Sequence, residues 1–355
     1  MSKSRISNPL LAVVSYNHEI GGATADSLIQ VIMQKLDMTV ALADYRKITP
    51  PQDNLDSIFI NNDLVFKVVA NSKRRAWAYL KDADCLILPG NHAIIDPRLF
   101  GGNLSADQQI DLARAIAEMA LIHVAMQRGI PILAVCGGHQ IINIYLGGKV
   151  ADLSEDDIDQ QGFMAYASIL FDKNSEIAKI CYKNSKTVRG NFFGAHQEAV
   201  TEYGGKGLIN NKDDSMAVVA VANDANFNIE GMEAKYGAPI YSFQFHPEVS
   251  VVGMYSKLYR AVSYHPETQH DIEISLRLFI AFKQAAQTFQ TKKLIKFDQF
   301  KNDIRNKTKD PQNEQAYHFT SGTNVKPTLR SIFTEVRTDE TQKDDSAVIE
   351  VRYKP

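Results

Sequence analysis

A cysteine followed by two glycines is the place in this chain where side-chain chemistry is most clearly indicated. Pro131 precedes residues 132–135, whose unbroken apolar run is typical of a short strand covered on both faces. Cys136 follows directly, and the two glycines after it allow a sharp turn into a helix expected from Gln140 onward. Such a turn exposes a nucleophile, and the helix amino terminus favours the negative charge of a thiolate or an oxyanion. The alternative is a cysteine that is simply buried after a strand.

A second candidate group lies far downstream, at the end of another apolar segment. Residues 239–245 have the character of a strand, and His246, Pro247 and Glu248 follow it. Alternate residues of an extended chain point to the same side, so the carboxylate of Glu248 is expected behind the imidazole of His246. Pro247 favours the extended conformation of His246 that this arrangement needs. A cysteine, a histidine base and a carboxylate that orients the histidine make a nucleophilic triad. Taken alone, His-Pro-Glu also fits an ordinary polar strand end.

Together the two segments resemble the class I glutamine amidotransferase-like superfamily, which combines a Gly-x-Cys-x-Gly-x-Gln-type elbow with a downstream His-Pro-Glu. Ala134 stands where that elbow usually begins with glycine. Residues 84–91 resemble the strand and loop that supply an oxyanion-hole N–H, and residues 229–233 resemble the strand leading into the histidine strand. Residues 191–197 loosely resemble the Asn-Ser-x-His-x-Gln segment of the γ-glutamyl hydrolase branch, which is γ-glutamyl-GABA hydrolase-like. The resemblance covers about residues 9–289.

The resemblance implies a cysteine hydrolase that cleaves a γ-glutamyl amide bond through a γ-glutamyl thioester. It implies no cofactor, and the nine scattered histidines form no metal-ligand pattern. The implied residues are the catalytic Cys136, His246 and Glu248, the oxyanion-hole Gly137, Gly90 and Asn91, and the substrate-binding Gln140, His196 and Gln197.

Two other functions stay open at this point. The first is a glutaminase subunit that supplies ammonia to a separate synthetase, because no synthetase or nucleotide-binding signature follows the resembling region. The second is a non-catalytic or protein-directed interaction protein. His196 also has an alternative, which is an ordinary histidine in a surface loop.

Composition narrows the class of protein and its partners. The formal net charge of −2 argues against a dominant nucleic-acid-binding surface. The three cysteines leave at least one unpaired, which suits a reducing compartment and predicts a cytoplasmic protein. The apolar residues 10–14 are too few for a signal-peptide core or a membrane span. We therefore expect a small γ-glutamyl substrate or glutamine as partner, and neither nucleic acid nor membrane.

Strand-like and helix-like patterns alternate along the chain, which predicts an α/β fold with a doubly wound, mostly parallel sheet and helices on both faces. The resemblance makes this the flavodoxin-like fold of class I glutamine amidotransferases. Strands are expected over residues 10–15, 38–43, 85–88, 216–221 and 228–232, and helices over residues 25–36, 72–81, 107–128 and 272–289.

The clearest helical pattern is that of residues 107–128, whose apolar residues recur at three- and four-residue steps. Its polar stripe consists of Asp107, Asp111, Arg114 and Glu118.

With 355 residues the chain can bury one large core and carry an appendage. We expect a hydrolase domain over residues 1–289 and a C-terminal extension of unknown role over residues 290–355. The mixed charges of the extension are typical of a solvated surface. A homodimer, and a protein partner bound through the extension, both stay open.

Overall fold

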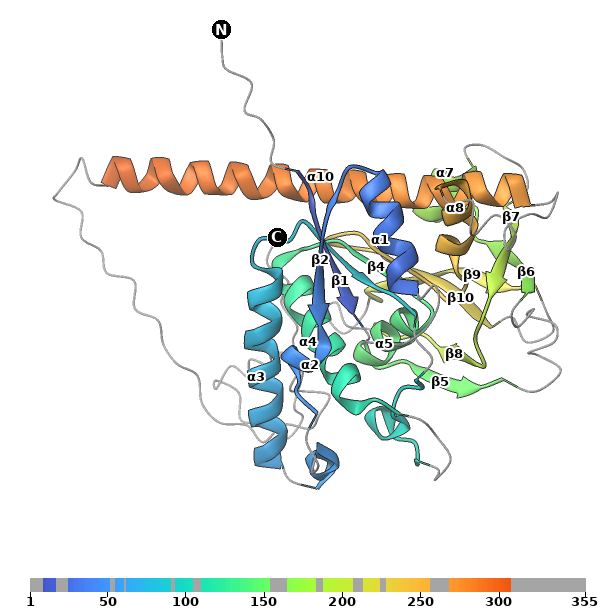
Figure 1. Ribbon diagram of the computed structural model, residues 1–355, viewed down its shortest axis with the longest axis horizontal. Coiled ribbons are helices and arrows are strands. Elements are labelled where there is room, and N and C mark those ends of the chain that lie inside the picture. The colour runs from blue at the N-terminus through green and yellow to red at the C-terminus, as the bar shows by residue number, and fades with distance from the viewer. Residues whose placement is uncertain are drawn as a thin grey trace, which may run out of the picture.

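The computed structural model describes residues 9–16, 25–51, 55–60, 62–90, 93–104, 110–153, 165–182, 188–206, 213–223, 228–255 and 268–307. Within them the chain forms one extended sheet with helices packed on both of its faces (Figure 1). The predicted α/β fold class is confirmed.

Five parallel strands make up the half of the sheet that carries Cys136 and His246. Each neighbouring pair among them is parallel, so their carboxyl ends meet at one edge of the sheet. Cys136 directly follows one of these strands. His246 lies three residues beyond Phe243, which is the last residue of the strand beside it. In order across the sheet the strands are β2 (Thr39–Asp44), β1 (Leu11–Tyr16), β3 (Cys85–Leu88), β4 (Ile132–Val135) and β11 (Ile240–Phe243).

Antiparallel strands extend the sheet beyond β11. The strands expected over residues 216–221 and 228–232 are both present, and as β9 and β10 they are antiparallel neighbours. Two more strands, β5 and β8, pair with each other, and β8 also meets β10. The strands of this part are β10 (Ile229–Ala234), β9 (Met216–Ala222), β6 (Ala165–Phe171), β7 (Arg189–Gly194), β8 (Glu198–Glu202) and β5 (Lys149–Asp152).

The central strands are apolar throughout because both of their faces are covered. In β3, for example, Leu86 and Ile87 are fully buried in two different core clusters, one on each face. The first cluster is covered by α2 (Tyr45–Ile48), α3 (Asn62–Leu80), α4 (Leu112–Arg128), α5 (Gly137–Tyr145) and the short 3₁₀ helices η1 (Leu55–Phe59) and η2 (Pro97–Phe100). The second is covered by α1 (Ala25–Lys35), α7 (Glu176–Tyr182), α8 (Pro247–Tyr255) and α10 (Thr268–Lys307).

Helix α4 differs from the predicted helix in its start and in its polar stripe. It begins at Leu112, because the side chain of Asp111 accepts a hydrogen bond from the Arg114 N–H and caps the helix. Asp107 lies outside the described residues. The polar stripe does not face solvent at Arg114 and Glu118, which are only 3% and 2% exposed. They form an ion pair inside the protein.

Helix α10 is much longer than the predicted segment 272–289. Its first part packs on the sheet, and the helix then continues past the expected domain boundary to Lys307 and extends beyond the sheet (Figure 1). Lys293 and Gln290 tie this continuation to the body through the carboxylate of Asp84, at 2.7 and 3.0 Å. The extension beyond residue 307 lies outside the described residues.

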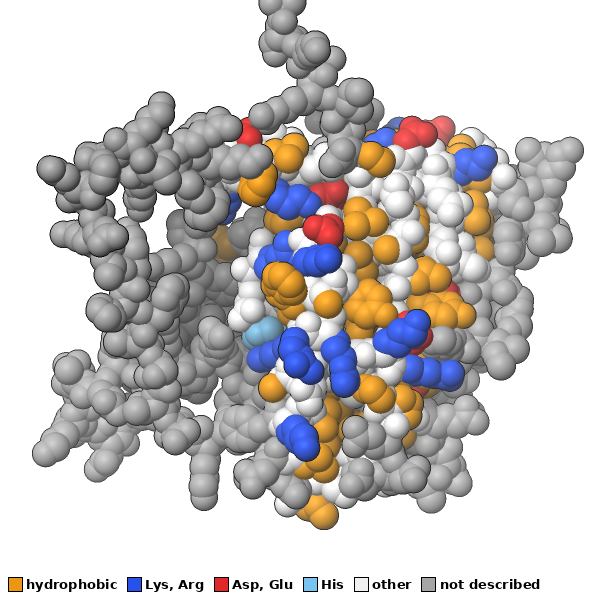
Figure 2. Space-filling view, turned by 60° about the vertical axis from the view of Figure 1, so that its left-hand side comes forward, with side chains coloured by type: hydrophobic (Ala, Val, Ile, Leu, Met, Phe, Trp, Pro, Cys, Tyr) orange, Lys and Arg blue, Asp and Glu red, His pale blue; other side chains and the backbone are white. Residues whose placement is uncertain are grey.

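The side of the molecule to which α3 belongs is rich in lysine and arginine side chains (Figure 2). Trp77 on α3 is 54% exposed. Among the described helices, none has the length and apolar character needed to cross a membrane.

Candidate active site

Cys136 sits at the junction of β4 and α5 in a backbone conformation that L-residues rarely adopt. Its φ and ψ are 50° and −110°, and Asp37 is the only other non-glycine residue with positive φ in the described part of the chain. The Cys136 N–H donates to the Phe243 carbonyl at 2.7 Å, and its own carbonyl accepts from the Gln140 N–H at 3.0 Å. These bonds fix a strained turn at the amino terminus of a helix. The helix begins at Gly137, earlier than the predicted Gln140.

Two glycines allow this turn to pack closely against the end of β3. A Cβ atom at Gly138 would lie 2.1 Å from the Leu88 carbonyl oxygen, so only glycine fits there. A Cβ atom at Gly90 would lie 3.0 Å from Cβ of Cys136 and 3.1 Å from Cε1 of His246. The structure therefore brings together Gly90, Cys136 and His246, three of the residues implied by the resemblance. Asn91 lies outside the described residues.

His246 and Glu248 are paired, but by a different local geometry from the one expected. Strand β11 already ends at Phe243, and α8 begins at Pro247, so Glu248 belongs to the first turn of a helix. The expectation that the chain stays extended through Glu248 is wrong, because proline is also favoured at the first position of a helix. Nδ1 of His246 nevertheless lies 2.6 Å from Oε1 of the fully buried Glu248.

The charge state of His246 follows from its two acidic neighbours. Burial lowers the pKa of His246, but the negative charges of Glu248 and of the Cys136 thiolate outweigh it and raise this pKa well above its usual range. Because Nδ1 is engaged by Glu248, Nε2 is the nitrogen left to exchange a proton with the Cys136 thiol. The arrangement can hold a thiolate beside an imidazolium.

Behind this turn, the buried ion pair of α4 supports the loop that follows β3. The guanidinium of Arg114 donates to Glu118 at 3.1 Å and to the Pro89 carbonyl at 3.4 Å. Ser15 donates to the same carboxylate at 2.8 Å. Burial raises the pKa of Glu118, and Arg114 and Ser15 oppose that rise. The network thus fixes Pro89, the residue before Gly90.

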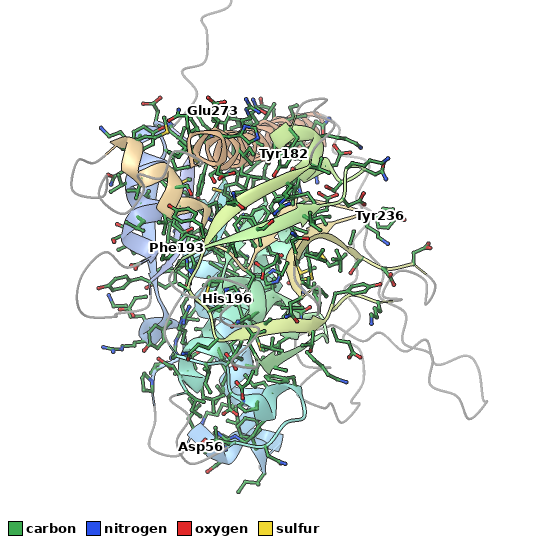
Figure 3. The ribbon with its side chains drawn as sticks, turned by 90° about the vertical axis from the view of Figure 1, so that its right-hand side faces the viewer. Asp56, Tyr182, Phe193, His196, Tyr236 and Glu273 are labelled. Atoms are coloured by element: carbon green, nitrogen blue, oxygen red, sulfur yellow. The ribbon has the colours of Figure 1, made fainter. Side chains whose placement is uncertain are left out.

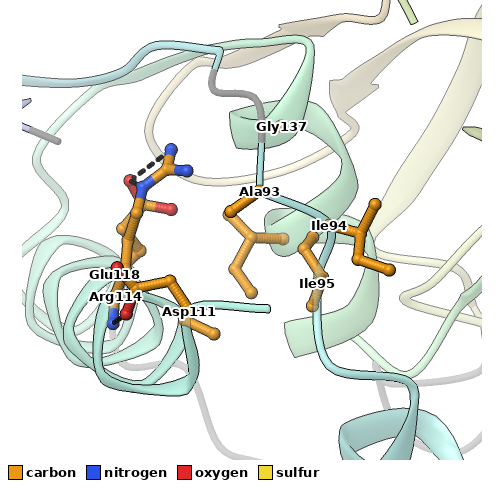
Figure 4. A pocket seen from close by; sticks show the side chains of 9 residues that line it. Ala93, Ile94, Ile95, Asp111, Arg114, Glu118 and Gly137 are labelled. Carbon is orange, nitrogen blue, oxygen red and sulfur yellow. Dashed lines mark hydrogen bonds and ion pairs between the residues drawn. The ribbon is translucent and has the colours of Figure 1, made fainter. Parts of the chain in front are cut away.

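A small pocket lies between this network and the start of α5 (Figure 4). Its lining includes Ile94, Ile95, Asp111, Arg114, Glu118 and Gly137. Sequence reasoning missed this network, because the i, i+4 spacing of Arg114 and Glu118 is equally typical of a solvated helix face.

Gln140 is oriented into the protein. Its side-chain amide donates to the Glu198 carbonyl at 2.9 Å and to Oε1 of Gln244 at 3.3 Å. Only 6% of the residue is exposed. These contacts tie the first turn of α5 to the start of β8, which is a positioning arrangement for the turn at Cys136.

The two residues predicted downstream of β7 separate in the structure. His196 is buried, with its Nε2 atom 3.5 Å from Oε1 of the fully buried Glu230, so it is not a surface-loop histidine (Figure 3). Gln197 is exposed, and its carbonyl accepts a hydrogen bond from the Leu153 N–H. The structure therefore places His196 inside the protein and Gln197 at its surface.

Phe193 and Tyr166 are neighbours of the site that sequence reasoning did not single out. The Phe193 carbonyl accepts a hydrogen bond from the His246 N–H at 2.9 Å, and its ring meets the His246 imidazole edge-on. Phe193 lies within the segment 191–197 that carried the resemblance, but no rule of spacing distinguished it from Phe192.

Among the described residues, no group of three or more His, Cys, Asp or Glu side chains is arranged to hold a metal ion.

Comparison with known proteins identifies the class. The profile of the peptidase C26 family matches residues 29–248, which include Cys136, His246 and Glu248. The chain belongs to the peptidase C26 family, and with its fold this makes it a glutamine amidotransferase-like hydrolase by class. The resemblance inferred from the sequence is confirmed.

Three relatives are similar to parts of this chain. A glutamine amidotransferase-like protein of Rickettsia prowazekii, so named provisionally, is 38% identical over 150 residues, which cover 38% of this chain and 92% of that protein. A protein of Rickettsia bellii named as an ankyrin repeat protein is 36% identical over 295 residues, covering 80% of this chain. The chain spans only 43% of the length of that relative. A γ-glutamyl-γ-aminobutyrate hydrolase of Escherichia coli O157:H7 is 37% identical over 71 residues, covering 20% of this chain and 28% of that enzyme.

Proposed function

We propose that this protein is a cysteine hydrolase that cleaves a γ-glutamyl amide bond through a γ-glutamyl thioester. The observation that carries the proposal is the strained Cys136 at the amino terminus of α5, beside the buried His246–Glu248 pair. Backbone strain of this kind persists where the surrounding structure enforces it, and it clusters at functional sites. The similarity to a γ-glutamyl-γ-aminobutyrate hydrolase supports the γ-glutamyl part of the substrate.

In the first half of the reaction, the Cys136 thiolate attacks the γ-carbonyl carbon and forms a carbon–sulfur bond. The carbonyl oxygen becomes an oxyanion, which the N–H of Gly137 and the N–H of Gly90 or Asn91 stabilise. The carbon–nitrogen bond then breaks while His246 gives its proton to the leaving amine. Glu248 holds the imidazole in the required tautomer.

In the second half, water hydrolyses the thioester. His246, now neutral, takes a proton from the water as its oxygen attacks the carbonyl carbon. The carbon–sulfur bond breaks, the acid product leaves, and the thiolate–imidazolium pair is restored. Gln140 serves as a positioning residue that anchors α5 through Glu198 and Gln244.

The test is the release of amine or ammonia from a panel of γ-glutamyl amides and free glutamine, by wild type and by Cys136→Ala. Turnover of a γ-glutamyl amide that is lost in Cys136→Ala, with little turnover of glutamine, is the expected result. Turnover of glutamine alone would instead support an ammonia-donating subunit. Absence of turnover across the whole panel would contradict the proposal and favour an interaction protein.

A matched cysteine control is available within the chain. Burial raises the pKa of the Cys181 thiol to about 12, so this residue should not react as a nucleophile. A glutamine-like electrophile should label wild type and Cys181→Ala equally and leave Cys136→Ala unlabelled.

A further inference from the structure

We infer that Phe193 and Tyr166 form a subsite for the leaving amine, and that the preferred substrates are γ-glutamyl amides of an apolar amine. The inference rests on the proposed hydrolase and goes further, because it names the chemical class of the leaving group. It starts from the aromatic side chains that stand beside His246, the group that protonates the leaving nitrogen in the proposed mechanism.

Phe193 is held in a fixed position relative to His246. The backbone hydrogen bond from the His246 N–H to the Phe193 carbonyl is 2.9 Å long. The two rings are 6.1 Å apart between centroids and are inclined at 66°, so one ring presents its edge to the other. Phe193 is only half-buried, so part of this residue is open to solvent.

Tyr166 continues the same aromatic surface on the neighbouring strand. Tyr166 of β6 and Phe193 of β7 are direct partners in the antiparallel register. Their ring centroids are 5.9 Å apart at an angle of 71°. The Tyr166 hydroxyl is buried beside Ser250 of α8, and burial raises the pKa of Tyr166. Tyr166 therefore turns its hydroxyl inward, although the residue as a whole is only half-buried.

The proposed chemistry fixes the side of the site on which the amine lies. When Cys136 is bonded to the γ-carbonyl carbon, the oxyanion faces the N–H groups beside Gly90 and Gly137. The nitrogen must then face Nε2 of His246, which protonates it. A substituent on that nitrogen that passes the imidazole meets Phe193, whose ring centroid is 6.1 Å from that of His246. The aromatic pair is thus placed to contact the part of the substrate that free glutamine lacks.

A plainer role for the pair is to shield His246 and Glu248 from water. In that case Phe193 would support the imidazole equally for every substrate, and its loss would slow all of them by the same factor. If Phe193 belongs to a leaving-group subsite, its loss should slow some substrates more than others, because the subsite discriminates between amines. Hydrophobic subsites typically discriminate by about 10- to 200-fold per group accommodated.

The experiment compares kcat/KM for γ-glutamyl-cyclohexylmethylamide and γ-glutamyl-methylamide, whose amines are both simple primary alkylamines. Wild type should prefer the larger amide by at least about 10-fold. Phe193→Ala should reduce this preference to near unity, chiefly through a higher KM for the larger amide. Tyr236→Ala, which alters an exposed residue between β10 and β11, should keep the preference. Phe193→Leu serves as the second variant if Phe193→Ala does not fold.

Three results would overturn the inference. One is equal turnover of the two amides by wild type, another is an unchanged preference in both Phe193 variants, and the third is an equal loss on both amides. All three require Cys136-dependent turnover and so leave the proposed hydrolase standing. Failure of wild type to cleave any γ-glutamyl amide of the panel would instead contradict the hydrolase itself, and this inference with it.

Discussion

Nδ1 of His246 lies 2.6 Å from Oε1 of Glu248, although the two residues belong to a loop and to the first turn of α8. Glu248 has no exposed surface, so solvent does not screen its interaction with the imidazole. The carboxylate therefore determines which imidazole nitrogen is engaged and which one faces Cys136. It also stabilises the protonated imidazole.

Replacing Glu248 by Gln should lower kcat of the proposed hydrolase by about 10²- to 10⁴-fold, because the amide neither stabilises the imidazolium nor fixes its tautomer. The pKa of His246 is raised by the Glu248 charge, so removing that charge lowers it. If loss of the imidazolium sets the alkaline limb of the kcat/KM profile, that limb should move to lower pH in Glu248→Gln.

The measurement is a pH–rate profile of wild type and Glu248→Gln. Glu176→Gln is a suitable control, since Glu176 is a mostly exposed carboxylate on α7. An alkaline limb at the same pH in wild type and Glu248→Gln would contradict the assigned role of Glu248.

The backbone strain at Cys136 predicts that glycine is more stable than alanine at this position. Glycine adopts positive φ without penalty, which relieves about 1–3 kcal/mol of strain. Glycine also costs about 0.5–1 kcal/mol through the flexibility of the unfolded chain. Cys136→Gly should therefore exceed Cys136→Ala in free energy of unfolding by about 1 kcal/mol in urea titrations, while both lack activity. Equal or greater stability of the alanine variant would show that the turn is not strained.

Gly138→Ala should disrupt the turn by steric contact. The added Cβ would approach the Leu88 carbonyl oxygen to 2.1 Å, and this neighbour is backbone that cannot rotate away. We expect a loss of about 1–3 kcal/mol in the free energy of unfolding together with loss of turnover. Gly237→Ala is the contrasting control: its φ of 84° makes alanine strained there as well, but the space around its Cβ position is open, so turnover should be kept. Normal turnover in Gly138→Ala would contradict the close packing of α5 on β3.

The central strands could be predicted from the sequence because burial on both faces leaves an unmistakable apolar run. The strands over residues 85–88 and 132–135 begin and end where predicted, and the turn at Cys136 follows the second of them as expected. The pairing of His246 with Glu248 was also predictable, although its helical geometry was not. Proline fits both a chain that stays extended and the first turn of a helix, so the sequence does not decide between these two conformations for Glu248.

The surroundings of the site were harder to predict because they depend on contacts between distant segments. The burial of Arg114 and Glu118 depends on residues 93–95 and on Ser15, and no periodicity of the sequence places these near α4. The aromatic neighbour Phe193 depends likewise on how β7 approaches the end of β11.

The buried pair on α4 should behave as a coupled unit. Arg114→Met leaves the Glu118 carboxylate buried without its cation, which typically costs about 3–5 kcal/mol. Adding Glu118→Gln removes the uncompensated charge and should recover most of that loss in urea unfolding. The double variant should still have reduced activity, because Pro89 has lost its guanidinium partner. A double variant no more stable than Arg114→Met would contradict this coupling.

Glu198 should make the protein less stable as the pH rises through neutrality. Burial, and to a smaller extent the charge of Asp152 directly opposite on β5, raise the pKa of Glu198 from 4.5 to about 7. Between these two values the folded state binds a proton that the unfolded state has released, so protonation favours folding. This contribution is complete below pH 4.5 and is lost as the pH rises through about 7.

Glu198→Gln removes this titration while keeping the size of the side chain. From pH 5 to pH 8, its free energy of unfolding should therefore rise relative to wild type by about 2 kcal/mol. Urea unfolding of both proteins at several pH values measures the difference. Asp152→Asn removes the charge that contributes less to the raised pKa of Glu198. It should shift the midpoint of the pH dependence of stability to lower pH. A difference between wild type and Glu198→Gln that does not change with pH would show that Glu198 is ionised at neutral pH like an ordinary surface carboxylate.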